Sequence, residues 1–251
     1  MTVEHDQVDL PSIAMDSAAS HLAQDKVWVV CVVHLAGLPH DFTFTAETAR
    51  SVLDEAQANT EFPTGAFQFA AGGYQIVTNP DHRIVTLGSE SAPHLEAKFG
   101  FGDAGVVATG FTRSGQLDDG TVNPGAVVLS DMEAVASDAV ILAFEAAVAL
   151  GYEGPVEAMI GVSSRGTPLS LYTIDEIDGG LTELAADLDV ITPVRASMDF
   201  STATSPRDVH LFLHGITTDI ATQFGTQPQH TALRPEGADY YQRFPESSAE
   251  R

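Results

Sequence analysis

Apolar side chains first form an unbroken run and then alternate with polar ones along the N-terminal half of the chain. The run at 27–33 is rich in β-branched residues and predicts a strand buried on both faces. Thr45 is placed to cap a helix over about 46–58. From 66 to 111, short alternating stretches separated by glycine and proline turns predict an antiparallel meander. This half is therefore expected to mix α and β structure.

The strongest helix pattern lies in the middle of the chain. A short strand at 126–129 leads into it, and the helix is expected to run to residue 150 because its apolar residues cover nearly the whole circumference. Ser130 and Glu133 have the spacing of a capping box at its start. Gly151 supplies the left-handed residue that ends it. A helix of this kind is expected to be covered on most sides.

The C-terminal half predicts three strands and a last helix. The strands at 156–162 and 169–173 flank a short polar turn, which predicts a hairpin. The stretch 194–200 alternates as a strand with one solvent-facing side. Ser205 is placed to cap a helix at 206–224, with a proline and an aspartate in its first turn. The acidic stretch 175–189, between the second and the third of these strands, predicts no clear element.

The two ends of the chain lack a sustained apolar period. Ordering them would cost conformational entropy with little burial in return. We therefore expect flexible tails at 1–25 and 226–251, around a single α+β domain at 26–225. In that domain a largely antiparallel sheet is expected to pack against one long apolar helix and two flanking helices.

The charge of the chain limits the partners that it can bind. Its 35 acidic and 11 basic residues give a net charge of −24, and only two of the basic residues are lysines. Proteins that bind nucleic acid neutralise phosphates with clustered lysine and arginine, and this chain has no such cluster. Direct binding to nucleic acid is therefore not expected. The acidity is expected to serve solubility or adaptation to a salty cytoplasm, and docking onto a basic partner is the alternative.

The compartment is predicted from cysteine and hydropathy. Cys31 is the only cysteine, which excludes an internal disulfide and a cysteine-based zinc cluster. The apolar stretch 139–150 has twelve residues, whereas a helix that spans a bilayer needs about 20. The acidic first 26 residues do not resemble a secretory signal. We expect a cytoplasmic protein without membrane association.

Two glycine-containing motifs suggest chemistry that their surroundings do not support. The segment 100–105 matches G-x-G-x-x-G, but a strand follows it where a dinucleotide site needs a helix. No lysine follows Lys98, so the phosphate-pairing charge of a kinase-like loop is also missing. The segment 161–166 resembles a nucleophile elbow, but its second glycine comes one residue late. We expect turns at both places, no serine hydrolase and no cofactor.

Metal ligands are the remaining candidates. His210 and His214 lie four residues apart on the last helix, so both rings project from one face at a spacing that can hold a transition metal. Because no third ligand is evident, they are weak metal candidates, and the alternative is that they are surface or half-buried residues. Asp118 and Asp119 could bind calcium or magnesium, but the spacing of a calcium loop is absent and a solvated turn is expected. Cys31 is expected to be buried and inert, and Glu153 and Glu157 have no evident acid/base partner.

Three short segments carry a family resemblance: 94–97, 150–157 and 219–225. With the order of elements, they make residues 73–225 resemble the C-terminal module that follows the Schlafen/AlbA-type DNA-binding domain in proteins of high-G+C bacteria. The resemblance implies an accessory module, and none of the three segments is catalytic. The Glu-x-Lys and Asn-x-x-Gly-Gly elements of the N-terminal AlbA-type domain have no counterpart in this chain.

The function is predicted mainly from the lack of a strong catalytic signature. The first hypothesis is an accessory or interaction module without a catalytic site, whose partner is a protein. The alternative is a small-molecule sensor or an enzyme with a dispersed site, which an apolar pocket with converging polar groups would indicate. A nucleic-acid-associated regulator is the second alternative. Catalytic residues are not predicted, and the oligomeric state stays open.

Overall fold

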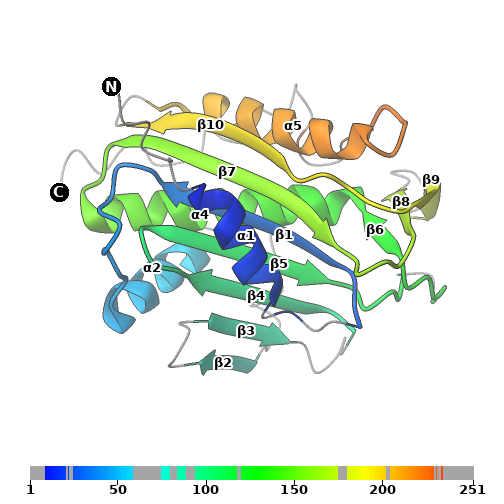
Figure 1. The fold of residues 1–251 in the computed structure, drawn as a ribbon, viewed down its shortest axis with the longest axis horizontal. Coiled ribbons are helices and arrows are strands. Elements are labelled where there is room, and N and C mark those ends of the chain that lie inside the picture. Colours follow the sequence, from blue (N-terminus) through cyan, green and yellow to red (C-terminus); the bar gives the residue numbers. More distant parts are fainter. Residues whose placement is uncertain are drawn as a thin grey trace, which may run out of the picture.

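The protein has an α+β fold built on a seven-stranded sheet (Figure 1). The computed structural model describes residues 9–20, 22, 25–58, 75–79, 84–88, 94–117, 120–174, 180–201, 204–228, 230 and 233. The large sheet is antiparallel throughout, and its strands lie in the order β10 (Val194–Phe200), β7 (Gly154–Ser163), β1 (Trp28–Leu35), β5 (Val106–Thr112), β4 (Glu96–Phe101), β3 (Ile84–Gly88) and β2 (Gln75–Asn79).

A second sheet of three strands contains β6 (Ala126–Val128), β8 (Leu169–Ile174) and β9 (Leu181–Leu188). Strand β6 is parallel to β8, and β9 is antiparallel to it. The helices are α1 (Leu10–Ser20), α2 (Ala46–Ala58), α4 (Leu129–Leu150) and α5 (Pro206–Thr222). None of the helices in the described part of the chain combines the length and the apolar composition needed to cross a lipid bilayer.

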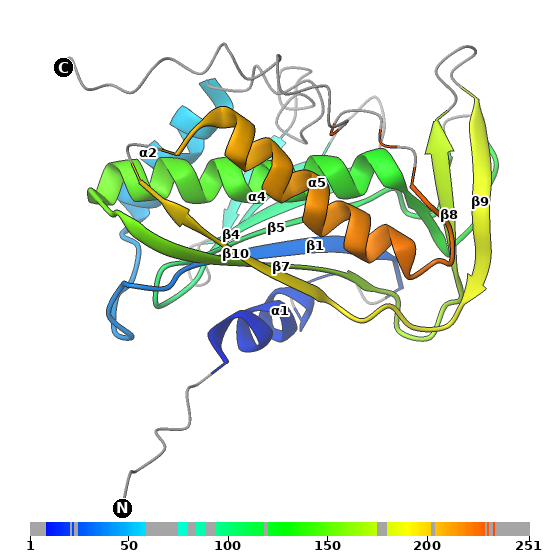
Figure 2. The same ribbon diagram turned by 90° about the horizontal axis from the view of Figure 1, so that it is seen from above.

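Strand β1 forms the centre of the molecule because it is buried on both faces, as its β-branched sequence predicts. Figure 2 shows α2, α4 and α5 on one side of the large sheet and α1 on the other. The α4 side packs the odd-numbered residues of β1, among them Cys31, Val33 and Leu35, into the main core. The α1 side packs Trp28 and its even-numbered neighbours. Because successive side chains of β1 point to opposite faces of the sheet, this one strand contributes residues to both cores.

Helix α1 was missed by the prediction that the first 25 residues form a tail. Its side chain Met15 and the following Leu22 pack against Trp28, Val30 and Val32 of the sheet. The helix has only a short apolar stripe, so its pattern is weak without the sheet that it covers. At the other end of the chain, His230 and Leu233 are buried, whereas the rest of the predicted tail beyond Leu233 lies outside the described residues.

The predicted capping box at the start of α4 is wrong. The helix begins at Leu129, two residues before the start that a Ser130 cap predicts, and its N-cap Val128 offers no side-chain hydrogen bond. Asp131 and Glu133 lie in its first two turns and are both buried. Arg113 binds the Asp131 carboxylate with two nitrogens, at 2.5 and 2.9 Å. The acidic residues of this helix therefore make long-range contacts, and the predicted stop at Gly151, with φ 60°, is confirmed.

The caps of α5 provide a direct comparison. Ser205 and Asp208 form the capping box that Ser130 and Glu133 do not. Replacing Ser205 by alanine is expected to lower the free energy of unfolding by about 1 kcal/mol, because a backbone N–H of the first turn loses its acceptor. Chemical denaturation measures the change. Ser130→Ala is the matched control and should leave stability nearly unchanged. A loss as large as that of Ser205→Ala would contradict the cap assignment.

The predicted hairpin of β7 and β8 is also wrong. Strand β7 pairs with β1 on one side and with β10 on the other, so neither of its edges is open to β8. Strand β8 instead joins the small sheet between β6 and β9. Strand β9 was missed because its acidic sequence shows no regular apolar alternation. By contrast, β2 to β5 form the antiparallel meander that the sequence predicts.

Candidate functional site

Polar groups gather at two places in the described structure. The first, the buried polar cluster, consists of Glu133, His214, Thr218, His230 and the backbone of Leu233. The second, the edge hollow, lies between the end of β10 and the start of α5. Helix α5 contributes to both, with its first turns at the hollow and its middle turns at the cluster.

The buried polar cluster joins α4, α5 and the stretch that follows α5. Nδ1 of His230 lies 2.7 Å from Oε1 of Glu133, and Nε2 lies 2.8 Å from Oγ1 of Thr218. When the Glu133 carboxylate is ionised it can only accept, and Nδ1 of His230 then carries the hydrogen of this contact. The N–H of Leu233 reaches the same oxygen at 3.4 Å. The carboxylate of Glu133 is fully buried and is therefore satisfied in part by the C-terminal stretch.

The cluster has the order of groups found in a hydrolase triad: hydroxyl, imidazole and carboxylate. A triad also needs N–H groups near the hydroxyl that can stabilise an oxyanion. Thr218 lies in the interior of α5, where the backbone N–H groups bond within the helix. The arrangement therefore favours a structural role, in which His230 holds the C-terminal stretch against α4 and α5.

The two histidines proposed as weak metal ligands point into the protein. His210 is fully buried, and His214 bonds through Nδ1 to the carbonyl oxygen of Leu233 at 2.8 Å. The rings of His214 and His230 are 4.5 Å apart. In the part of the chain that is described, no three histidine, cysteine or acidic residues are grouped so as to hold a metal ion. The shared face of the two histidines thus serves packing and hydrogen bonding in this structure.

The other sequence candidates lie apart from one another. The glycine segment 100–105 forms the turn between β4 and β5, in which Gly102 N–H donates to the Val106 carbonyl at 2.8 Å. The segment 161–166 leads from β7 into a turn. Burial raises the pKa of the Cys31 thiol, which is unreactive in this state. Asp118 and Asp119 lie outside the described residues.

Glu157 lies near a histidine that the sequence did not suggest. Nδ1 of the buried His34 is 3.8 Å from the Glu157 carboxylate, too far for a hydrogen bond. Burial lowers the pKa of His34, and Glu157 opposes that shift. The imidazole is therefore neutral at physiological pH. Glu153 is exposed.

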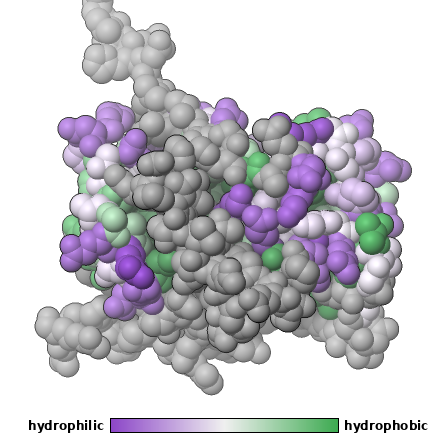
Figure 3. Space-filling model, turned by 90° about the horizontal axis from the view of Figure 1, so that it is seen from below, coloured by the Kyte–Doolittle hydropathy of each residue, from purple (hydrophilic) through white to green (hydrophobic). Residues whose placement is uncertain are grey.

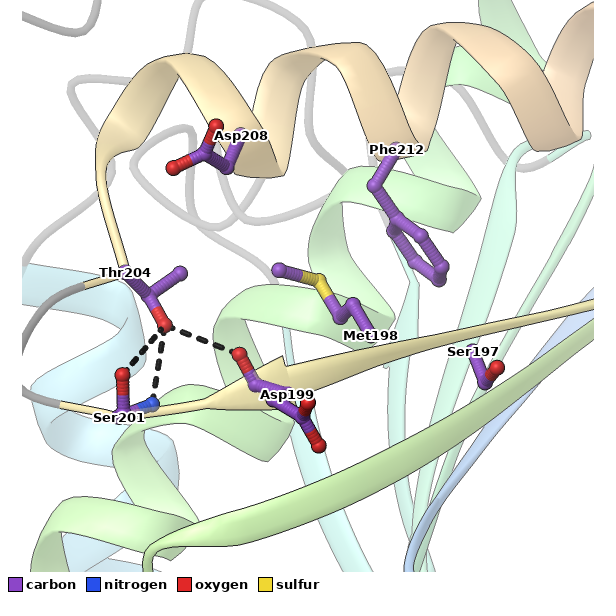
Figure 4. Close-up of a pocket in the computed structure, with 7 residues that line it drawn as sticks. All are labelled: Ser197, Met198, Asp199, Ser201, Thr204, Asp208 and Phe212. Carbon is purple, nitrogen blue, oxygen red and sulfur yellow. Dashed lines mark hydrogen bonds between the residues drawn. The ribbon is translucent and has the colours of Figure 1, made fainter.

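The edge hollow is an open depression of about 420 Å³ (Figure 4). Its lining comes from the end of β10, the following turn and one side of α5: Ser197, Met198, Asp199, Ser201, Thr204, Asp208 and Phe212. Met198 and Phe212 form its apolar part, and the remaining side chains are hydroxyls and carboxylates. Hydrogen bonds from Ser205 lower the pKa of Asp208, which is therefore charged at neutral pH.

Three consecutive residues of β10 line the hollow although their side chains alternate between the faces of the sheet. A depression that touches all three must run along the edge of the strand. Among the described strands, β7 alone pairs with β10. The hollow therefore borders the open edge of the large sheet.

The direction of the backbone groups at this edge follows from Pro155, which stands opposite Asp199 in the ladder. Proline has no N–H, and the Pro155 carbonyl accepts from Ala36 on the β1 side at 3.0 Å. The Asp199 backbone groups must therefore point away from β7. Hydrogen-bonded and non-hydrogen-bonded pairs alternate along an antiparallel ladder, so the backbone groups of Ser197 and Arg195 point away from β7 too. These N–H and C=O groups can pair with another strand, and the Asp199 carbonyl, which already accepts from the Thr204 hydroxyl at 3.0 Å, keeps one lone pair for this.

Comparison of the chain with models of protein families, with curated proteins and with solved structures finds no match. The resemblance of residues 73–225 to the Schlafen/AlbA-associated module thus stays a prediction. The function has to be argued from the geometry of this chain.

The sequence did not locate either polar site. Glu133 was assigned to a cap and His230 to a tail, and their contact spans 97 residues. The alternation of 194–200 correctly indicated a strand with one exposed side. It carried no information that this strand is the last one in the sheet, because the order of strands depends on long-range pairing.

Proposed function

We propose that the protein is an interaction module that binds an extended segment of a protein along the open edge of β10. The observation that carries the proposal is the outward direction of the backbone groups of Arg195, Ser197 and Asp199 beside the edge hollow. A bound strand gains main-chain hydrogen bonds at such an edge, and neighbouring pockets select its alternate side chains.

The exposed surface favours recognition through the backbone. The large hydrophobic residues exposed in the described structure are Val122, Val148, Val190 and Leu211. They come from separate elements. On the face shown in Figure 3, which lies at the β2 end of the sheet and away from β10, the coloured residues are largely hydrophilic and the hydrophobic ones form separate small areas. A large apolar patch of the kind that marks many interfaces is therefore not evident among these residues.

The lining of the hollow favours binding over catalysis. Its titratable groups are Asp199 and Asp208, and Asp208 already accepts hydrogen bonds from the N–H and hydroxyl of Ser205. Neither a histidine that could act as a general base nor a cationic anchor for a phosphate is among the residues that line it. The charge of −24 likewise disfavours nucleic acid as the partner.

The test selects binding peptides from a displayed random library and measures their affinity for two variants. Ser197→Pro removes an outward N–H without affecting a β7 hydrogen bond, and proline is tolerated on edge strands. Ser197→Ala is the matched control, because it keeps the backbone N–H. We expect the selected peptides to bind Ser197→Pro at least about tenfold more weakly than the control. The reason is that the variant loses one or more main-chain hydrogen bonds between β10 and the peptide.

Thermal unfolding of both variants verifies that they remain folded. In a bound strand, every second N–H of the peptide points to β10. N-methylation at these positions should weaken binding, and N-methylation at the positions between them should not. Peptides that bind wild type, Ser197→Ala and Ser197→Pro equally well would show that the β10 edge is not the binding site.

A further inference from the structure

The sequence of β10 is complementary to itself when two copies run antiparallel. Its seven residues read Val-Arg-Ala-Ser-Met-Asp-Phe, with Ser197 at the centre. If a two-fold axis passes through Ser197, Arg195 of one copy stands opposite Asp199 of the other. Ala196 then stands opposite Met198, and Val194 opposite Phe200. Each charge meets its opposite, and each small apolar side chain meets a larger one.

The outward backbone groups select the same register. Arg195, Ser197 and Asp199 direct their N–H and C=O groups to the open edge, so across a two-fold axis they can stand opposite only other outward-facing residues. An axis at Arg195 would place two arginines opposite each other, and an axis at Asp199 would place two aspartates so. Like charges directly opposite each other destabilise a strand pair. Axes at Ala196 and Met198 would place Arg195 opposite Ser197 and Ser201, and neither forms a pair of opposite charges. Only the axis at Ser197 pairs arginine with aspartate, and it does so twice.

The two ends of the exposed edge are already closed. At one end, Gln223 of α5 bonds to both the N–H and the carbonyl of Thr192, at 2.8 and 2.7 Å. At the other end, the Thr204 hydroxyl donates to the Asp199 carbonyl and accepts from the Ser201 N–H (Figure 4). The outward backbone groups left between these closures are those of Arg195 and Ser197, together with the Asp199 N–H. A strand of the length of β10 therefore fits the edge, whereas a longer one would meet α5.

The faces of β10 fit the same pairing. Met198 faces α5 and reaches the hollow beside Phe212 (Figure 4). Ala196 and Val194 of a second copy would point to this face and are small enough to enter a depression of about 420 Å³. Arg195 and Asp199 lie on the opposite, exposed face. Arg195 already contacts Asp9 of its own chain, but a guanidinium has five N–H donors and can serve a second carboxylate.

We propose that the segment bound at the β10 edge is β10 of a second copy of this chain, paired antiparallel about Ser197. This proposal rests on the proposed function, because both use the same open edge. The dimer joins two seven-stranded sheets into one continuous sheet, and its interface is isologous. The net charge of −24 on each copy opposes association at low ionic strength, so the dimer forms best in buffers with physiological or higher salt.

Sedimentation velocity from micromolar to millimolar concentration tests the dimer. The wild-type mass should rise from 26.5 kDa towards twice that value as the concentration increases. Arg195→Asp and Asp199→Arg should each raise the dissociation constant about tenfold or more, because each variant places like charges opposite each other twice. The double variant Arg195→Asp with Asp199→Arg should return it to within about threefold of wild type.

The two single variants separate pairing from general repulsion. Arg195→Asp changes the net charge from −24 to −26, and Asp199→Arg changes it to −22. Repulsion alone would weaken association in the first variant and strengthen it in the second, whereas the proposed register weakens both. Thermal unfolding establishes that each variant is folded. Ser197→Pro should abolish the dimer and Ser197→Ala should retain it.

Two outcomes would overturn the inference. One is a wild-type chain that stays at 26.5 kDa over the whole concentration range. The other is a dimer that both single charge variants leave unchanged. If in either case the selected peptides still lose affinity for Ser197→Pro, strand addition by another protein stands and only the identity of the partner is wrong. If those peptides are also insensitive to Ser197→Pro, both proposals fail.

Discussion

Replacing His230 by alanine is expected to lower the free energy of unfolding by about 3 to 5 kcal/mol, because it removes one partner of a buried pair. His230 Nδ1 is 2.7 Å from a Glu133 carboxylate that is fully buried on α4. Without the imidazole, the buried carboxyl group of Glu133 loses its 2.7 Å hydrogen bond to His230. Urea denaturation followed by circular dichroism measures the change.

Two further variants identify the cause of that loss. Thr218→Val keeps the imidazole next to Glu133 and removes one hydrogen bond, so it should cost only about 1 kcal/mol. Replacing Glu133 by leucine together with His230→Ala removes the buried charge, and this double variant should be more stable than His230→Ala alone. A His230→Ala protein as stable as wild type would mean that the C-terminal stretch does not anchor α4 and α5.

Alanine at Gly125 is expected to destabilise the protein by about 3 kcal/mol, at the upper end of the usual cost of overpacking. A Cβ atom there would lie 1.8 Å from the carbonyl oxygen of Pro168, so the backbone itself would have to move. The neighbouring Ser170 N–H donates to the Gly125 carbonyl at 2.9 Å. The displacement would therefore disturb the pairing of β6 with β8. Denaturation and the amide exchange of β8 measure the effect.

Gly215 is the matched control for this substitution. It lies inside α5, and a Cβ atom there would meet no atom within 4 Å. Gly215→Ala should stabilise the protein by about 0.5 to 1 kcal/mol, because alanine loses less backbone entropy in a helix. If the two substitutions had similar effects, the close approach of Gly125 to Pro168 would be wrong.

Helix α5 contributes residues to both the buried polar cluster and the edge hollow. Its middle turns hold His214 and Thr218 against the C-terminal stretch, and its first turn borders the hollow. Stability variants of the cluster can therefore be compared with binding variants of the edge. His230→Ala is expected to affect unfolding and Ser197→Pro to affect association, so the two effects should separate cleanly in a folded protein.

The sequence by itself determined the elements whose signals are local. The β-branched run predicted β1, Thr45 predicted the start of α2, and Ser205 predicted the start of α5. Each of these signals depends on neighbours within one turn or one strand. The α+β class followed from the same periods. Here the chemistry of a few consecutive residues is sufficient, because the interactions are made between them.

Only the tertiary structure decided where the strands pair and which charges meet. Strand β8 leaves β7 because β1 and β10 already occupy both edges of β7. Glu133 binds His230 instead of its own helix start, across 97 residues. The open edge of β10 likewise exists because no later strand in the described chain joins it. Pairing between distant segments is a competition for the same backbone groups, and its outcome depends on the whole set of elements at once.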